Sequence, residues 1–485
     1  MAVEFDLVII GGGSGGLVVA SASAQLGAKV ALVEKHRLGG DCLWYGCVPS
    51  KSLLHAGRVA QEVRTGSRFG VYADEPRINF SEAIGHVQGV IKHIEPHDSP
   101  ERFRGLGVDV IFGEGQFTDR KTFVVNGREL KARNFVISTG SRPAIPPIPG
   151  LKEVGFITNE QVFSLEERPA SLAVLGGGAI GCELGQALSR LGAEVTLVVR
   201  SNIMSKEEPE AAAVVEQKLI EEGITILKNT SIVSVERDGE LKRLTTNDGK
   251  EILVEEILLA AGRSPNVGGL NLEAAGVEYD TKKGVKVNEK LQTTNPQIFA
   301  CGDIIGGYQF THVAGYEAVV VLTNALFKSI IPGGLFMDKA DYRVIPWATF
   351  TEPELARVGM TEAQARARYG DDIYILKQDF NDVDRAQAEG ATEGFAKIIT
   401  DPKGQILGAH MVGPHAGEII HEIVLAMKNK LPVKSLTLSA GMIHIYPTLA
   451  EMNMKVSLQL SKQTYTESTK GKLAKFFNFR RSIAG

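Results

Sequence analysis

Two cysteines stand five positions apart in the segment 39–51, which reads GGDCLWYGCVPSK. On an undistorted helix, which turns about 100° per residue, Cys42 and Cys47 would point in different directions. A disulfide needs its Cβ atoms within about 4.5 Å of each other. Gly46 and Pro49 supply an irregular helix entry at which the two sulfurs could meet. We therefore expect a redox-active dithiol held against a bound cofactor, and two structural thiols are the alternative.

The helix that follows must position this pair. Residues 52–70 predict a helix whose apolar stripe comprises Leu53, Leu54, Val59 and Val63. A stripe of this kind is more typical of core packing than of a site, so we expect it to face the interior.

A nucleotide-binding pattern directly precedes the two cysteines. An apolar strand predicted over 5–10 runs into Gly11, Gly13 and Gly16 in a G-x-G-x-x-G spacing, and a small-residue helix and a second strand follow. Glycines there let the backbone approach a pyrophosphate, whose charge the helix N-terminus attracts. Glu34, which ends the second strand, would accept hydrogen bonds from a ribose.

The same pattern recurs after a strand predicted over 172–175. Gly176, Gly178 and Gly181 repeat the glycine spacing, and another helix and strand follow. The chain thus contains a weak internal duplication, which predicts two dinucleotide folds for two dinucleotides. The proline-rich run 143–150 is a stiff crossover and indicates the boundary between them.

Cations after the second fold favour a phosphorylated nucleotide. Val199 occupies the position at which an acid would bind the ribose, Arg200 comes next, and Lys206 follows six residues later. Cations there suit a 2′-phosphate, so NADPH is the expected donor and NADH stays possible. The alternative is that both cations belong to the solvated surface.

These motifs together resemble the class I pyridine nucleotide-disulfide oxidoreductases, a family that includes dihydrolipoamide dehydrogenase, glutathione reductase and mercuric reductase. The resemblance covers residues 1 to about 461. It implies an α/β fold with two Rossmann-like dinucleotide-binding domains, as in glutathione reductase, and an α+β C-terminal dimerisation domain. It departs at Asp41 and at Trp44-Tyr45, where the family usually has Thr and Asn-Val.

The resemblance also implies the order of the domains. They are an FAD-binding domain over 1–157, an NAD(P)H-binding domain over 158–281, a return to the FAD and central domain over 282–340, a dimerisation domain over 341–461 and a basic tail over 462–485. The tail carries five cations with three phenylalanines between them. A solvated terminus is the favoured interpretation, and a contact with a membrane surface is the minority one.

The implied cofactors are FAD and NADP, with NAD as the alternative, and no metal site is indicated. The residues expected to bind FAD are Gly11, Gly13, Ser14, Gly16, Glu34, Lys35, Gly40, Asp41, Lys51, Gln116, Thr139, Gly140, Asp303, Phe310 and Thr311. The other residues expected to bind a cofactor belong to the second dinucleotide fold and are Gly176, Gly178, Ile180, Gly181, Glu183, Arg200, Lys206, Gly262 and Arg263. The resemblance implies that Glu183 pairs with Lys51 near the flavin and that Asp303 binds the ribityl chain.

A C-terminal segment bears on the subfamily. Thiol-disulfide members carry His directly before the proline found here as Pro447, with a Glu five residues after that His; this chain keeps Glu451 but has Tyr446 at the His position. Tyrosine has a pKa near 10 and cannot become a cation. His444 is a candidate displaced base, and a loop histidine satisfied by backbone is its alternative. Mercuric reductases carry Tyr in this region, but also a C-terminal cysteine pair, whereas this chain has no cysteine after Cys301.

The catalytic set implied by the resemblance is Cys42, Cys47, His444, Tyr446 and Glu451. Electrons would pass from NAD(P)H through FAD and the dithiol to a small-molecule disulfide, a metal, a quinone-like acceptor or a lipoyl-bearing protein. The alternatives are a dihydrolipoamide dehydrogenase working with NAD, a mercuric-reductase-like enzyme, or a flavoprotein with a regulatory role and little turnover. A homodimer is implied, in which Tyr446 and Glu451 of one subunit face Cys42 of the other.

Composition limits the class of protein. The 485 residues carry a net charge of −4 and are 44% hydrophobic, values typical of a soluble protein without a nucleic-acid footprint. Four cysteines in so long a chain do not indicate a secreted disulfide framework. With no signal-peptide pattern and no apolar run of ~18 residues, a cytoplasmic location is expected.

Overall fold

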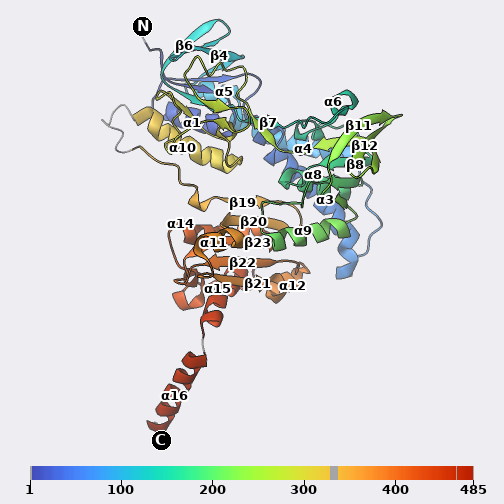
Figure 1. The fold of residues 1–485 in the computed structure, drawn as a ribbon, viewed down its shortest axis with the longest axis vertical. Helices are drawn as coiled ribbons and strands as arrows, with labels where there is room; N and C mark the ends of the chain where they lie inside the picture. Colours follow the sequence, from blue (N-terminus) through green and yellow to red (C-terminus); the bar gives the residue numbers. More distant parts are fainter. Residues whose placement is uncertain (1–2, 328–336, 466, 484–485) are drawn as a thin grey trace. The chain divides into compact units, whose positions relative to one another are not determined.

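The computed structural model describes residues 3–327, 337–465 and 467–483 (Figure 1). The predicted ranges 1–157, 282–340 and 462–485 each include a few residues outside these parts. The chain divides into two compact units. Unit 1 comprises Met1–Ile203 and Glu222–Asp341, and unit 2 comprises Met204–Glu221 and Tyr342–Gly485.

The first sheet of unit 1 has the strand order β3-β2-β1-β6-β5-β4, and β18 also pairs with β6. Its parallel strands are β1 (Phe5–Ile10), β2 (Val30–Glu34), β3 (Asp109–Phe112), β6 (Arg128–Ile137) and β18 (Ile298–Ala300), and its antiparallel strands are β4 (Gly115–Asp119) and β5 (Thr122–Val125). Leu7 and Ile9 pack with apolar residues of α1 (Ser14–Gln25) and α10 (Thr311–Phe327), whereas Val8 packs with the phenylalanines of β4 and β5. Burial on both faces explains why β1 is a continuous apolar run.

The second sheet of unit 1 is parallel and has the order β10-β9-β8-β14. Its strands are β8 (Ser171–Leu175), β9 (Glu194–Val198), β10 (Thr225–Leu227) and β14 (Glu256–Leu259), and the helix α8 (Ala179–Arg190) follows β8. An antiparallel sheet of β11 (Ile232–Asp238), β12 (Leu241–Thr246) and β13 (Glu251–Val254) shares a core with it. The internal duplication predicted from the glycine spacing is therefore present as two strand-helix-strand units.

Unit 1 has further helices and strands. They are α2 (Gly40–Trp44), α3 (Cys47–Thr65), α4 (Phe80–Ile94), α5 (Pro100–Gly105), α6 (Leu151–Val154), α7 (Asn159–Val162), β7 (Ser141–Pro143), β15 (Arg263–Pro265), β16 (Tyr279–Asp280) and β17 (Gly284–Val285). The antiparallel pair β7–β15 joins the two dinucleotide folds, because β7 follows the first and β15 ends the second.

The stripe predicted for the helix after the cysteines is wrong in two of its four residues. In α3, Leu53 is buried, but Val59 and Val63 are 48% and 37% exposed. The buried face instead carries small residues, because α3 packs closely on α8. A Cβ on Gly57 would lie 3.3 Å from the Cα of Ala187, so a larger side chain would push the helices apart.

Unit 2 is built on an antiparallel sheet with the order β19-β20-β23-β22-β21. These strands are β19 (Pro346–Thr349), β20 (Glu354–Gly359), β21 (Tyr374–Asp379), β22 (Phe395–Thr400) and β23 (Ile406–Gly413). The helices are α9 (Pro209–Glu221), α11 (Glu362–Tyr369), α12 (Asp384–Glu389), α13 (Ala416–Ile419), α14 (His421–Lys428), α15 (Glu451–Thr464) and α16 (Glu467–Ile483). The sheet begins at Pro346, and the sequence places the expected α+β segment from about residue 341.

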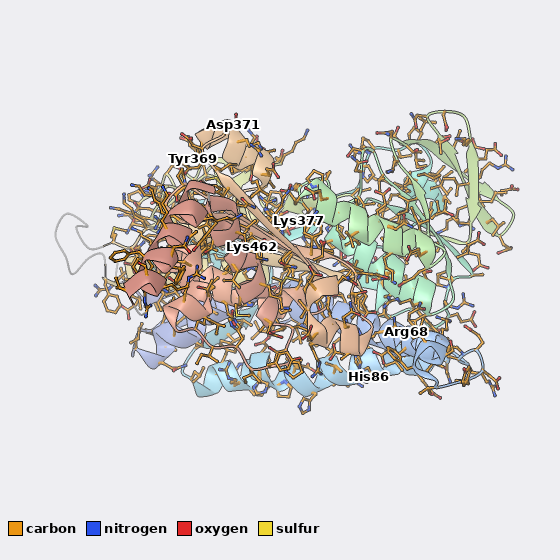
Figure 2. All side chains as sticks on the ribbon, turned by 90° about the horizontal axis from the view of Figure 1, so that it is seen from below. Arg68, His86, Tyr369, Asp371, Lys377 and Lys462 are labelled. Carbon is orange, nitrogen blue, oxygen red and sulfur yellow. The ribbon has the colours of Figure 1, made fainter. Side chains whose placement is uncertain are left out.

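A buried ammonium ties α9 to this sheet. Lys397 on β22 lies 2.7–3.0 Å from carboxylates of Glu208, Glu210 and Glu362, and Lys377 on β21, labelled in Figure 2, also contacts Glu210. The three carboxylates lie close enough to hold a metal ion. In this protein, however, the cation among them is the side chain of Lys397, which pairs with the buried carboxylate of Glu208 and with the more exposed carboxylates of Glu210 and Glu362.

Candidate active site

A break between two helices brings the cysteines together. The helix α2 ends at Trp44, and α3 begins at Cys47, which leaves Tyr45 and Gly46 outside both. A Cβ on Gly46 would lie 2.9 Å from the backbone oxygen of Asp41, so glycine permits the tight approach. The pair therefore meets at an irregular helix entry, as the spacing predicts.

Both thiols are free, and they are hydrogen-bonded to each other. The bond from Cys42, a 3.2 Å contact with the Thr311 hydroxyl and the charge of Lys51 lower the pKa of Cys47 to about 6, although burial acts in the opposite direction. The same bond and burial raise the pKa of Cys42. At neutral pH, Cys47 is therefore the thiolate and Cys42 is the thiol that donates to it.

An ion pair lies one helical turn beyond the thiolate. Lys51 Nζ donates to Glu183 Oε2 at 2.8 Å, and the Glu183 side chain is only 6% exposed. This is the pair that the family resemblance implies. It connects the first turns of α3 and α8, and thereby fixes a positive charge near Cys47.

Arg263 forms a second ionic network that the sequence reasoning did not anticipate. Its guanidinium lies 3.3 Å from Asp41 and 3.6 Å from Asp303, and it donates to the Ser141 hydroxyl at 2.7 Å. Ser141 in turn donates to Asp303 at 2.5 Å. Burial raises the pKa of Asp303, while Ser141 and Arg263 oppose that rise. The departure at Asp41 was the available signal, because a half-buried acid beside a dithiol needs a cation.

Asn159 is another residue that the sequence did not indicate. Its amide donates to Asp41 Oδ1 at 3.3 Å and to the backbone oxygen of Tyr45 at 2.9 Å, and it begins α7. It thus holds the backbone between α2 and α3 from the side of the second dinucleotide fold.

The glycine-rich turn after β1 fits the pyrophosphate of FAD. Gly11 has φ +108°, and a Cβ there would lie 2.4 Å from the Ser138 oxygen, while one on Gly16 would lie 1.9 Å from the Gly11 oxygen. A Cβ on Gly13 would instead meet only Gly40, at 3.8 Å, so the space above this turn is open. Backbone N–H groups at the start of α1 point toward such a ligand.

The other residues expected at FAD lie at strand ends, at helix starts and within β4. Glu34 accepts from the backbone N–H of Gly12 at 2.7 Å and from that of His36 at 2.9 Å, so its carboxylate is fixed beside the turn. Thr139 donates to Asn266, and Gly140 has φ +67°. Ser14 begins α1, Gly40 begins α2, Phe310 stacks on His312, and Lys35 and Gln116 are exposed. The set fits an extended FAD, and within the described residues Gln116 is an exposed member of the set.

The second glycine turn repeats this geometry. A Cβ on Gly181 would lie 2.0 Å from the Gly176 oxygen, whereas one on Gly178 has nothing within 4 Å. Ile180 is partly exposed at the start of α8, and Gly262 has φ +114° directly before Arg263. Arg200 is exposed after β9 in unit 1, and Lys206 is exposed in unit 2, where its backbone oxygen accepts from Arg357.

The two candidate bases of the C-terminal segment, His444 and Tyr446, lie in unit 2 and differ in burial and in hydrogen-bond partner. His444 has a side chain only 3% exposed, and its Nε2 lies 3.0 Å from Glu422 Oε2, so a carboxylate rather than backbone satisfies it. Tyr446 is 66% exposed and donates to Asp384 at 3.0 Å, which raises the Tyr446 pKa. Glu451 is buried, and its Oε2 has no hydrogen-bond partner among the described residues.

The remaining cysteines are structural in position. Cys301 is buried at the end of β18, where burial raises its pKa, and Cys182 is buried in α8. Neither is described in contact with the Cys42–Cys47 pair.

Comparison with known proteins places the chain in a family. A family model described as pyridine nucleotide-disulphide oxidoreductase matches residues 5–318, and the model of that family's dimerisation domain matches residues 345–456. Mercuric reductase from Lysinibacillus sphaericus is 36% identical over 95% of this chain and 84% of that protein. Dihydrolipoyl dehydrogenase from Thermus scotoductus is 36% identical over 95% of this chain and 98% of that protein.

Solved structures agree with this result. The HOCl-induced flavoprotein disulfide reductase RclA from Escherichia coli has a TM-score of 0.80 and 27% identity, covering 93% of this chain and 98% of that chain. A structure of its Cu(II) complex matches equally well, with a TM-score of 0.80 and 27% identity over 92% of this chain and 98% of that one. The predicted α/β fold and dimerisation domain are thereby confirmed, and the latter supports a homodimer. The chain belongs to the class I pyridine nucleotide-disulfide oxidoreductases, FAD-dependent enzymes that take electrons from NAD(P)H and act on disulfide or metal substrates.

Proposed function

We propose that this enzyme uses NADPH to reduce a thiophilic metal ion, of the Hg(II) or Cu(II) class, at its dithiol. The observation that carries the proposal is the combination of a thiolate at Cys47, a thiol at Cys42 and a tyrosine in place of the usual histidine. Soft metal ions prefer sulfur ligands. A metal ion also has no thiol to deprotonate, so its reduction does not depend on an imidazole base.

The electron count fits this acceptor. Bound FAD would supply two-electron chemistry between a reduced nicotinamide and the dithiol. One NADPH can reduce one Hg(II) to Hg(0), or two Cu(II) to two Cu(I), and each reaction releases NADP⁺ and one proton. The relatives support the choice, since one is a mercuric reductase and another was solved as a Cu(II) complex.

Residues of this chain have separate tasks in the proposal. Cys47 holds the negative charge, which Thr311 and Lys51 stabilise, while Cys42 offers the second sulfur. Tyr446 stays protonated, because its pKa is raised, and it can donate a hydrogen bond to a metal-bound thiolate. Tyr446 and Glu451 of one subunit would face Cys42 of the other, which requires the homodimer. A monomer in sedimentation that keeps full activity would exclude this arrangement.

The donor is assigned from charge. Arg200 is an exposed cation after β9, and the buried Val199 offers no carboxylate to repel a 2′-phosphate. The test is kcat/KM for NADPH and NADH in the wild type and in Arg200→Glu, with Arg68→Glu as an exposed control. We expect NADPH preference in the wild type and its loss only in Arg200→Glu. Equal use of both donors in every protein would discard the assignment.

Thiol-disulfide exchange is the second candidate, and the contact between His444 and Glu422 favours it. A histidine oriented by a carboxylate can move a proton, which dihydrolipoamide or glutathione disulfide turnover requires. The 3% exposure of the His444 side chain weighs against direct access to a substrate.

A side-by-side acceptor panel separates these functions. Anaerobic NADPH oxidation would be followed with Hg(II), Cu(II), lipoamide, glutathione disulfide and a quinone, and NAD reduction by dihydrolipoamide would be followed in a separate assay. We expect the highest kcat/KM with a metal ion, and loss of that activity in Cys42→Ser but not in Cys182→Ser. The highest value with a disulfide would favour the second candidate. No turnover with any acceptor, in an enzyme that still reduces a dye, would indicate a regulatory flavoprotein instead.

A further inference from the structure

The helix α16 lies beyond the residues matched by the family's dimerisation domain, which end at 456. From 470 to 483 it reads KGKLAKFFNFRRSI, with five cations and no acid. The chain as a whole carries −4, so this terminal helix has the opposite charge to the rest of the protein. A basic segment of this kind attracts an anionic surface.

The apolar side chains of α16 occupy one broad face. Leu473, Phe476 and Phe477 follow the i, i+3, i+4 spacing, and Phe479 and Ile483 continue it from Phe476, so together they cover about half the helix circumference.

This face is uncovered in the described structure. Phe476, Phe477, Phe479 and Ile483 are between 52% and 68% exposed. Four large apolar side chains within eight residues form a patch that water solvates poorly, and such a patch usually has a partner.

Two of the five cations, Lys472 and Arg480, lie within this apolar arc. Their long aliphatic stems can lie along apolar surface while the charged groups reach the polar layer. The other three cations flank the arc: Lys475 lies on one side, and Lys470 and Arg481 lie on the other. Phenylalanines inside the arc and cations that reach its edges match a bilayer interface, where acyl chains lie below phosphate headgroups.

We propose that α16 is an interfacial membrane helix that lies in the plane of an anionic bilayer and holds this enzyme to its surface. The partner is defined by its chemistry: anionic phospholipid, with the aromatic face in the headgroup-acyl boundary and the cations on the phosphates. Within the described residues, no helix has the length and apolar composition needed to cross a bilayer, so the contact is with the surface.

The sequence alone favours a solvated tail over a membrane contact, whereas the exposed aromatic face favours the membrane contact. A solvated terminus explains the cations of the tail. It does not explain a 17-residue helix that displays its phenylalanines on one face. Nucleic acid would bind the five cations but would leave the aromatic face exposed to water. Another protein could cover the aromatic face, but binding it would not require cations on both sides of that face.

The test is flotation of the full-length holoenzyme with vesicles. We expect binding to vesicles of phosphatidylcholine with one third phosphatidylglycerol, weak binding to pure phosphatidylcholine, and release as salt rises. Neutralising Lys475 and Arg481 to Gln should weaken binding roughly five-fold per cation. The double substitution Phe476→Ser with Phe479→Ser should weaken vesicle binding by at least about ten-fold, because each one removes a large apolar side chain that the bilayer would bury.

Matched controls keep the test specific. Phe69→Ser, an exposed phenylalanine of unit 1, and Lys282→Gln with Lys283→Gln should leave vesicle binding unchanged. None of these residues belongs to the active site, so dye reduction with NADPH should match the wild type throughout. No flotation with anionic vesicles, equal binding by the aromatic variant, or binding to duplex DNA that exceeds vesicle binding would each overturn the proposal.

Discussion

The dithiol segment of unit 1 and the segment 443–451 of unit 2 differ in how many of their polar groups one chain satisfies. Around the dithiol, Cys47 contacts Thr311, Lys51 pairs with Glu183, and Asp41 pairs with Arg263. In the other segment, Glu451 Oε2 and His444 Nδ1 are buried with no hydrogen-bond partner among the described residues.

The exposed residues of the two segments differ as well. Ile443 and Ile445 are 82% and 80% exposed, and Tyr446 lies beside them. Apolar side chains displayed in this way are typical of a surface that another molecule covers. The dithiol segment, which would carry electrons, therefore has its polar partners within one chain. We infer that the segment 443–451, which would handle protons, is completed by a second copy of the chain.

Replacement of either cysteine tests the first half and should have the largest effect. Cys42→Ser and Cys47→Ser should each reduce acceptor turnover by at least about 10³-fold, because no second dithiol is described nearby. Dye reduction, which needs only the cofactors, should persist. The family resemblance implies that Cys47 contacts the flavin, where a thiolate near the electron-poor ring should give a long-wavelength charge-transfer absorbance. That absorbance should vanish in Cys47→Ser and appear without reductant in Cys42→Ser. The reverse spectra would mean that the two roles are exchanged.

Substitutions in the C-terminal segment test the second half. Tyr446→His should raise thiol-disulfide turnover by at least about ten-fold, since general acid-base catalysis typically contributes 10²–10⁴-fold. His444→Ala should cost little if its contact with Glu422 only orders the loop. Acceptor kinetics for both variants, with Tyr446→Phe as the control, provide the measurement. If His444→Ala removes most activity while Tyr446→Phe has no effect, the base is His444.

The charge near the thiolate gives a third, smaller test. Lys51→Met should raise the pKa of Cys47 by on the order of one unit, because an opposite charge that favours the thiolate is lost. The charge-transfer absorbance of the reduced enzyme would then fade at a higher pH than in the wild type, where the midpoint lies near the Cys47 pKa of about 6. Lys92→Met, an exposed lysine of α4, is the control and should leave the midpoint in place.

Sequence patterns predicted the regular elements well where periodicity and glycine spacing were both present. The strand over 5–10 and the helix that follows the second glycine turn lie where the spacing places them. The α3 stripe was wrong because Val59 and Val63 looked like core, whereas close packing on α8 selected Gly57 and Ala60. Sequence hydrophobicity cannot reveal that a neighbouring helix requires small residues.

Sequence motifs indicated single residues of the candidate site but not the contacts between them. The contact of Lys51 with Glu183 spans 132 positions and could be named only from the family resemblance. Ser141, Asn159 and Glu422 carry no motif, and their roles follow from folded positions alone. Arg263 was expected as a cofactor-binding residue at the end of the nicotinamide domain, and no motif indicates that its guanidinium lies between two carboxylates, Asp41 and Asp303.

A buried histidine makes the stability of unit 2 depend on pH, and the test of this dependence has the smallest expected effect. His410 on β23 is buried, its Nε2 lies 2.9 Å from the Met360 backbone oxygen, and burial lowers its pKa to about 4 from an ordinary 6.5. Between these values the unfolded chain binds a proton that the folded one does not. The stabilisation is therefore complete above pH 6.5 and is lost as pH falls toward 4, by up to about 3 kcal/mol.

The measurement can be confined to unit 2, because the chain has two tryptophans, Trp44 in unit 1 and Trp347 in unit 2. In a Trp44→Phe background, denaturation followed by Trp347 fluorescence should show a stability that falls from pH 6.5 to 4. His410→Gln should flatten that slope, whatever its effect on stability at pH 7, whereas the exposed His421→Gln should not. The carboxylates of Glu210 and Glu362, whose pKa values Lys397 lowers, begin to lose their contribution only as pH falls through the ordinary glutamate value of 4.5, near the acid end of this range. An unchanged slope in His410→Gln would show that the acid response of unit 2 arises elsewhere.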